Sequence, residues 1–110
     1  MKPKFNLWIE HKGNVVLSDW RVQLLEAVAA AGSVSAAAAQ MHVPAQRARQ
    51  KLKEMEQALG FKVVEPDPTG EGRRPLRLSA RGKRLVEQFG RFASGFDAEV
   101  ARRYRKAFGS

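Results

Sequence analysis

Residues 33–59 read SVSAAAAQMHVPAQRARQKLKEMEQAL, and this stretch decides the fold. Its alanine run predicts a short helix that is capped by Ser33 or Ser35. Pro44 is tolerated in the first turn of a helix, so a second helix is expected over 44–59, where apolar residues recur at helical spacing. Two helices that are joined by a tight turn form a helix-turn-helix.

The flanking sequence extends this motif into a single domain over residues 1–110. Alternating apolar residues predict a β-hairpin at the N-terminus, and two short strands around a loop rich in proline and glycine predict the wing of a winged helix. The expected segments are the N-terminal hairpin, three helices that include the helix-turn-helix, the wing and one long helix, over residues 5–18, 19–59, 61–78 and 79–107. The fold class is therefore α+β, mainly α, a winged helix-turn-helix with an N-terminal β-hairpin and a long C-terminal helix.

The charge balance points to an anionic partner. The 110 residues contain 20 Lys and Arg but 11 Asp and Glu, which gives a formal charge of +9 and a pI of about 10.7. Without cysteine, the chain cannot form a disulfide scaffold, a thiolate metal site or a cysteine nucleophile. No apolar run approaches the roughly 18–20 residues of a membrane span, and no apolar signal segment follows the basic N-terminus. We therefore expect a cytoplasmic protein with no membrane partner.

The sequence contains no arrangement that is typical of an enzyme. His11 and His42 are the only histidines, and neither has an acidic pair at ligand spacing. The glycines at 70 and 72 flank an acidic residue, and this segment is too short and too acidic to hold a phosphate. We predict no catalytic residue, no metal and no cofactor.

Basic residues concentrate in two windows that contain no acid, 43–53 and 73–84, and together these hold half of the 20 basic residues. The first window lies on the second helix of the helix-turn-helix, and the second lies on the wing and the helix start behind it. In a winged helix both elements face the same duplex, so we interpret these windows as a surface for double-stranded DNA.

The phase of the helix over 44–59 selects the side chains that face a duplex. If Ala48 points inward, then Gln46, Gln50 and Lys53 lie on the opposite face, with Arg49 beside them. Gln can pair with adenine and Arg with guanine in the major groove. The candidate DNA-binding residues are Ser33, Ser35, Gln46, Arg47, Arg49, Gln50, Lys53, Arg73 and Arg74. The two serines serve either as helix caps or as phosphate ligands, and the wing arginines either bind phosphate or keep the loop soluble.

A stripe of apolar residues spaced by three or four continues through residues 85–108. Such a stripe needs a cover, and a second copy of the chain would provide one. The candidate dimer-interface residues are Phe89, Phe92, Phe96, Val100 and Tyr104. Two alternatives stay open: the stripe packs on the hairpin of its own chain, or its start packs on the chain's own core and its end on a partner.

These segments resemble known regulators. AAGSVSAAA at 30–38 and LKEMEQALG at 52–60 resemble the helix-turn-helix of LysR-type regulators, and LSARGKRL at 78–85 resembles the start of their linker helix. LWIE at 7–10 resembles the opening strand of the DNA-binding domain of ModE-type molybdate-responsive regulators, which share the winged helix. The resemblance implies a homodimer, built from the hairpin and the long helix, that reads a two-fold symmetric operator. Molybdate binding is not expected, because these residues include no oxyanion-binding domain.

The sequence thus predicts a sequence-specific, double-stranded DNA-binding regulator of transcription that lacks enzymatic activity. The helix over about 44–59 would enter the major groove, and the wing loop, 66–75, would lie on the backbone or in the minor groove. Two alternatives remain: a winged helix that docks a protein partner, and a nucleic-acid binder without sequence preference.

Overall fold

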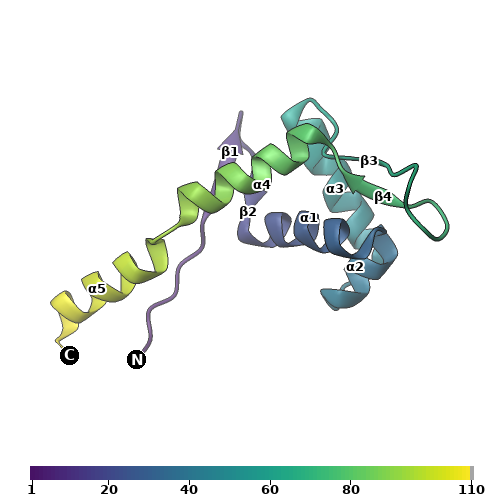
Figure 1. Ribbon diagram of the computed structural model, residues 1–110. Helices are drawn as coiled ribbons and strands as arrows, with labels where there is room; N and C mark the ends of the chain where they lie inside the picture. The colour runs from purple at the N-terminus through teal and green to yellow at the C-terminus, as the bar shows by residue number, and fades with distance from the viewer. Residues whose placement is uncertain (110) are drawn as a thin grey trace.

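The computed structural model describes residues 1–109, and its elements follow the order that the sequence predicts (Figure 1). Three helices follow an N-terminal hairpin, and a wing and two C-terminal helices follow these. The bounds are β1 Trp8–His11, β2 Asn14–Ser18, α1 Asp19–Ala31, α2 Val34–Gln40, α3 Ala45–Leu59, β3 Val64–Pro66, β4 Leu76–Leu78, α4 Ala80–Ala93 and α5 Phe96–Phe108. The winged helix-turn-helix is confirmed.

Local signals explain where the first helices begin and end. The Ser18 hydroxyl accepts a hydrogen bond from the Arg21 amide at 3.1 Å, which caps α1, and Gly32 ends that helix in the left-handed region with φ 76°. The Ser33 hydroxyl accepts from the Ala36 amide at 3.1 Å. Of the two possible caps for α2, the structure therefore uses Ser33.

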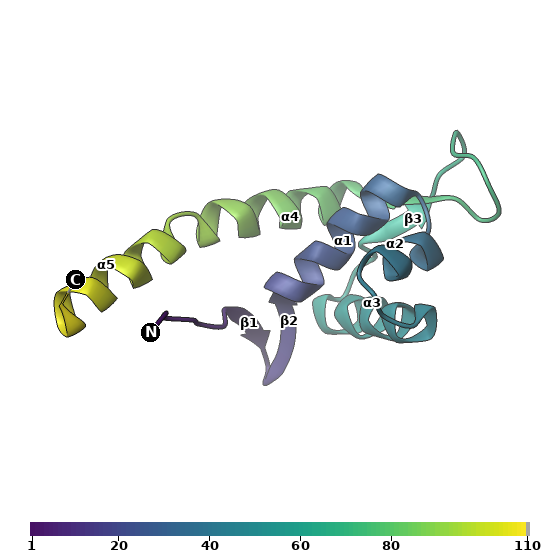
Figure 2. The ribbon, with the colours of Figure 1, turned by 90° about the horizontal axis from the view of Figure 1, so that it is seen from below.

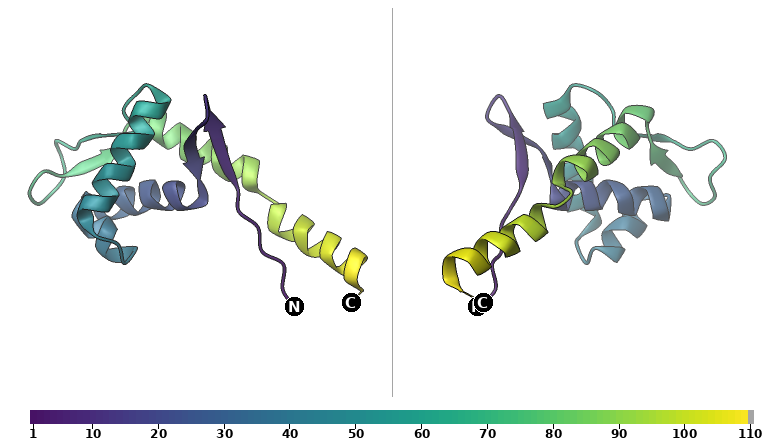
Figure 3. Two further views of the ribbon diagram at one scale, coloured as in Figure 1. Left: turned by 180° about the vertical axis from the view of Figure 1, so that it is seen from behind. Right: turned by 60° about the vertical axis from the view of Figure 1, so that its left-hand side comes forward.

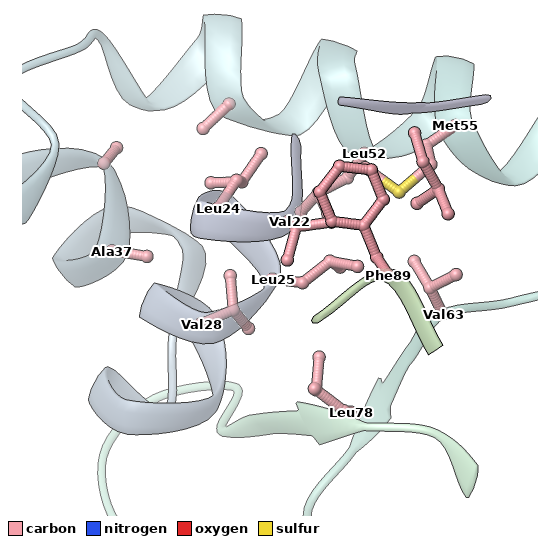
Figure 4. Close-up of a cluster of buried hydrophobic side chains, with 13 residues drawn as sticks. Val22, Leu24, Leu25, Val28, Ala37, Leu52, Met55, Val63, Leu78 and Phe89 are labelled. Atoms are coloured by element: carbon pink, nitrogen blue, oxygen red, sulfur yellow. The ribbon is translucent and has the colours of Figure 1, made fainter. Parts of the chain in front are cut away.

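One apolar core joins the three helices to the wing and to α4. Leu24 and Leu25 of α1 are fully buried, and so are Met55 of α3 and Val63 before β3. Phe89 of α4 lies within the same cluster (Figure 4). Because α4 contributes to this core, its start is fixed relative to the helix-turn-helix.

The two small sheets are separate antiparallel hairpins. In the first, β1 pairs with β2 across an irregularity between Ile9 and Glu10. Its strands begin later than the predicted hairpin over 5–18, because residues 1–7 form no strand and run toward α5, where the Phe5 and Phe96 rings lie 6.5 Å apart. In the second, β3 pairs with β4 to make the wing.

The single long helix predicted over 79–107 is wrong. Two helices occupy this segment, and the break between them falls at Ser94 and Gly95 (Figure 1). Ser94 leaves the helical region with ψ 127°, and Gly95 takes a left-handed conformation with φ 88°, which costs glycine little. The apolar spacing continues across the break, so the stripe gave no sign of it.

The molecule is elongated, with extents of 54 × 29 × 22 Å and a radius of gyration of 16.3 Å. A compact chain of this length would have about 13 Å. The difference arises because α5 and the N-terminal segment project from one end, while the helix-turn-helix and the wing lie at the other (Figures 1 and 2). Within residues 1–109, no single helix is long and apolar enough to cross a membrane, and α1 and α2 meet that test only as a pair bent by 120°.

Candidate nucleic-acid interface

The turn between α2 and α3 is held by backbone hydrogen bonds. The Val43 amide donates to the Ala38 carbonyl at 3.0 Å, and His42 adopts a left-handed conformation with φ 58°. Pro44 lies at the N-cap position, one residue before the helix, and provides no capping side chain. Val43 is partly buried and packs against the core, which helps to fix the angle between α2 and α3.

The α3 helix has one buried face and one exposed face. Ala48, Leu52 and Met55 are between 0% and 4% exposed and pack against α1 and α2. The exposed face carries all five of the residues that were predicted to face a duplex from this helix: Gln46, Arg47, Arg49, Gln50 and Lys53. The predicted phase of the helix is correct, and the face has the polar side chains that base edges and phosphates require.

The structure brings Ser35 and Arg49 together across the two helices. An Nη2 atom of Arg49 donates to the Ser35 hydroxyl at 3.1 Å, and both residues are exposed. Ser33 is engaged as a cap, but Ser35 is free of that role. The sequence left the same two roles open for both serines, and the structure distinguishes them: Ser33 caps α2, and Ser35 accepts a hydrogen bond from Arg49 of α3.

A second cluster on α3 includes residues that the sequence reasoning missed. Gln50 and Lys51 both donate to the Glu54 carboxylate, at 3.4 and 3.3 Å, and Arg21 of α1 lies 3.5 Å from it. The spacings of three and four between these α3 residues are a signal for such contacts. No local pattern could have indicated Arg21, which lies in another helix.

The wing presents two cations at its tip. Arg73 and Arg74 are exposed on the loop between β3 and β4, and within residues 1–109 no carboxylate lies within 4.0 Å of either guanidinium. Gly72 and Arg74 have φ of 91° and 56°, so the tip turns sharply. The Asp67 carboxylate accepts from the Thr69 hydroxyl at 2.8 Å and the Thr69 amide at 3.0 Å, which lowers the pKa of Asp67.

Two other cations of the 73–84 window have partners within the chain. Arg77 on β4 pairs with Glu65 on β3 at 2.8 Å and lies 3.9 Å from Asp67. The Arg81 guanidinium lies 4.1 Å from the centre of the Phe61 ring. These charges stabilise the wing and the start of α4, so they are less available to a ligand than their number in the sequence implied.

The wing is attached to the helix-turn-helix at its base. The Leu76 amide donates to the Gly32 carbonyl at 2.8 Å, which ties β4 to the loop between α1 and α2. The wing therefore lies at the same end of the molecule as α2 and the recognition-helix candidate α3, away from α5 (Figures 2 and 3).

The apolar stripe divides between the core and the surface. Phe89 is 4% exposed and belongs to the core of its own chain, so its assignment to a dimer interface is wrong. Phe92 is 51% exposed, and its ring lies 5.5 Å from that of Phe96. In α5, which has no buried residue, Val100 and Tyr104 are half-buried on the same stripe. From Phe92 onward the stripe is only partly covered within the chain, where Phe5 of the N-terminal segment lies beside Phe96.

Comparisons with known proteins identify relatives of this chain. The model of the bacterial regulatory helix-turn-helix proteins of the lysR family matches residues 20–83. The chain is similar to the CbnR_DBD–DNA complex, with 26% sequence identity and a TM-score of 0.61 over 80% of this chain and 94% of that chain. It is also similar to the complex of BenM_DBD with benA site 1 DNA, with 21% identity and a TM-score of 0.63 over 83% and 97%.

The chain also resembles ArgP from Mycobacterium tuberculosis, with 30% identity and a TM-score of 0.52. The match covers 74% of this chain and 30% of the ArgP chain. No curated protein matches the chain. The resemblance to ModE-type regulators, which rested on the N-terminal hairpin, finds no support in these comparisons.

The residues that the lysR family model matches include the whole helix-turn-helix and the wing, and they amount to more than half of the chain. The chain therefore belongs to the lysR family of bacterial regulatory helix-turn-helix proteins.

Proposed function

We propose that this chain regulates transcription by binding a preferred double-stranded DNA sequence, with α3 in the major groove and the wing on the backbone or in the minor groove. The observation that carries the proposal is the exposed face of α3. This face carries amide and guanidinium groups, which can bind base edges. The opposite face of α3 is packed into the core. The DNA in the CbnR_DBD and BenM_DBD complexes supports the same use of this fold.

The residues divide into two roles. Gln46, Gln50 and Arg49 have the groups that pair with adenine and guanine in the major groove. Arg47 and Lys53 on α3, together with Arg73 and Arg74 on the wing, would neutralise phosphates. Phosphate contacts position the domain without reading sequence, and base contacts select the site.

The functional unit is proposed to be a homodimer that is held by the partly exposed apolar stripe on α4 and α5, from Phe92 to Tyr104. A second copy can cover the same stripe by two-fold symmetry. Two α3 helices about 34 Å apart would then read the two halves of a symmetric site. The proposal is a binding function in the cytoplasm, without catalysis or a cofactor.

Salt dependence tests the proposed contact with DNA. A dimer with about three or four phosphate contacts per subunit should lose affinity with a slope of log K against log[salt] near −6. A slope shallower than about −2 would contradict the proposal.

Substitutions test the division of roles. Arg49→Ala or Gln46→Ala should relax sequence preference by about 1–3 kcal/mol at one or two base pairs. The double substitution Arg73→Ala and Arg74→Ala should weaken the binding of all duplexes by a similar factor. If the wing substitution changed sequence preference and the α3 substitutions did not, the assignment of α3 as the recognition helix would be wrong.

A further inference from the structure

Glu54 is the point on α3 where several polar side chains converge. Its Oε2 atom lies 3.3 Å from Lys51 Nζ and 3.5 Å from Arg21 Nη2, and its Oε1 atom accepts a hydrogen bond from Gln50 Nε2 at 3.4 Å. The carboxylate thus holds one cation and one amide of the helix that faces DNA in the proposed function. The other acid of α3, Glu56, has a structural task, because it accepts from the Val63 amide at 2.8 Å.

Arg21 of α1 connects this cluster to the N-terminal hairpin. Its side chain is 12% exposed, and its Nη1 atom donates to the Val15 carbonyl of β2 at 2.8 Å. The bond to Val15 holds the Arg21 guanidinium in place, so Glu54 lies beside a positive group of fixed position. The N-terminal hairpin, which lies outside the residues that the lysR family model matches, therefore helps to hold Glu54 in position through Arg21.

Glu54 and Lys51 are close to solvent, unlike Arg21. Their side chains are 39% and 37% exposed, so Lys51 is able to reach a phosphate if the carboxylate releases it. A lysine that binds phosphate adds the same free energy to every duplex, since phosphates carry no sequence information. A carboxylate beside it opposes that contact by pairing with the ammonium group.

We propose that Glu54 is a specificity-determining residue, which restrains Lys51 and Gln50 and so limits the affinity of the domain for DNA of any sequence. This inference rests on the proposed function of α3 as the recognition helix. Glu54 acts through Lys51 and Gln50 and is a positioning residue, without a contact of its own to DNA.

The test is Glu54→Gln in the full chain, which keeps the size of the side chain and removes its charge. Affinities for a selected preferred duplex and for random duplex are measured at several salt concentrations. Random-duplex affinity should rise by about three- to tenfold per subunit, and the salt slope should steepen by about 0.9 per subunit, because one phosphate contact is gained. The ratio of preferred to random affinity should fall.

Two further variants separate the mechanism from a general effect of charge. Glu26→Gln removes the same charge from an exposed site on α1 and should leave the salt slope unchanged. Adding Lys51→Gln to Glu54→Gln should restore the wild-type slope. Lys51→Gln alone should change random-duplex affinity by less than about twofold, since the lysine is already restrained.

Each outcome decides the inference. It is overturned if Glu54→Gln binds as the wild type does, if Glu26→Gln has an equal effect, or if the gain survives the loss of Lys51. The inference is also overturned if Lys51→Gln alone makes the slope of log K against log[salt] shallower by nearly one per subunit, since Lys51 would then already bind phosphate in the wild type. Because Lys51→Gln leaves Glu54 intact, this measurement still decides the inference if Glu54→Gln is unstable. If the wild type itself binds no duplex preferentially, the proposed function fails instead, so the two failures are distinguishable.

Discussion

Gly82 lies where α4 begins, against the backbone that leads into the wing. A Cβ atom at this position would meet the Val63 carbonyl group, with its oxygen in hard overlap, its carbon at 3.1 Å and the Val63 Cα at 3.2 Å. The same carbonyl oxygen accepts the Ser79 amide at 2.9 Å, and the Gly82 amide donates to the Ser79 hydroxyl at 3.0 Å. Gly82→Ala must therefore push α4 away from Val63 or break this cap.

The cost of Gly82→Ala follows from these contacts. Forcing an extra methyl group into packed backbone costs about 1–3 kcal/mol, and a disturbed N-cap costs about 1 kcal/mol more. The higher helix propensity of alanine returns about 1 kcal/mol. The net expectation is a loss of about 1–3 kcal/mol in the free energy of unfolding, which lowers Tm by roughly 5–20 °C for a domain of this size.

Gly90→Ala is the matched control, since Gly90 lies in the same helix and a Cβ atom there would meet nothing within 4 Å. Helix propensity alone should then raise the stability by up to about 1 kcal/mol. Thermal unfolding followed by circular dichroism, at equal protein concentration, compares the two variants. If Gly82→Ala is as stable as Gly90→Ala, the close approach of α4 to Val63 is wrong.

Three further predictions concern the two ends of the molecule. Ser35→Ala should lower the affinity for a preferred duplex by up to about tenfold and leave random duplex unchanged, because the Arg49 guanidinium loses its support; an equal loss on both duplexes would mean that Ser35 contacts phosphate. Phe96→Asp should give a folded monomer in sedimentation and circular dichroism, since each phenylalanine buried by a partner contributes about 1.5–3 kcal/mol, and a variant that stayed dimeric would refute the proposed interface. Hydrogen bonds from Arg102 and then Arg103 lower the pKa of Glu99 from its ordinary 4.5 to about 2. Because the pKa of Glu99 is depressed in the folded chain, the stabilisation of α5 by these ion pairs is fully present above about pH 4.5 and is lost as the pH falls through about 2. NMR titration of the Glu99 carboxyl group should therefore give a midpoint near 2. A midpoint near 4.5 would show that the ion pairs do not form.

Much of the fold follows from local chemistry. The serine and glycine at the two ends of α1 specify its bounds, and the helical spacing of Ala48, Leu52 and Met55 gives the correct phase of α3. These features depend on residues that are close in sequence, so a local pattern is sufficient to predict them. The exposed residues of α3 could therefore be chosen from the sequence.

The features that were missed depend on distant residues or on backbone conformation. The stripe steps from Phe92 to Phe96 with helical spacing, so periodicity could not reveal the break at Gly95. Arg77 lies in a window of the sequence that contains no acid, but the register of the wing sets it opposite Glu65. The number of basic residues in a stretch of sequence does not show which of them pair with acidic or aromatic side chains elsewhere in the fold.

Competition binding tests whether the exposed face of α3 selects a DNA sequence. Duplexes are selected from a random pool with the full chain, and the affinity for the selected duplex is compared with that for random duplex at one fixed salt concentration. We expect the affinity for the selected duplex to exceed that for random duplex by a factor of at least about 10³, the lower end of the range for specific DNA-binding proteins. A pool that stays random after selection, with a ratio near 1, would contradict sequence selection by α3 and indicate binding through phosphates alone.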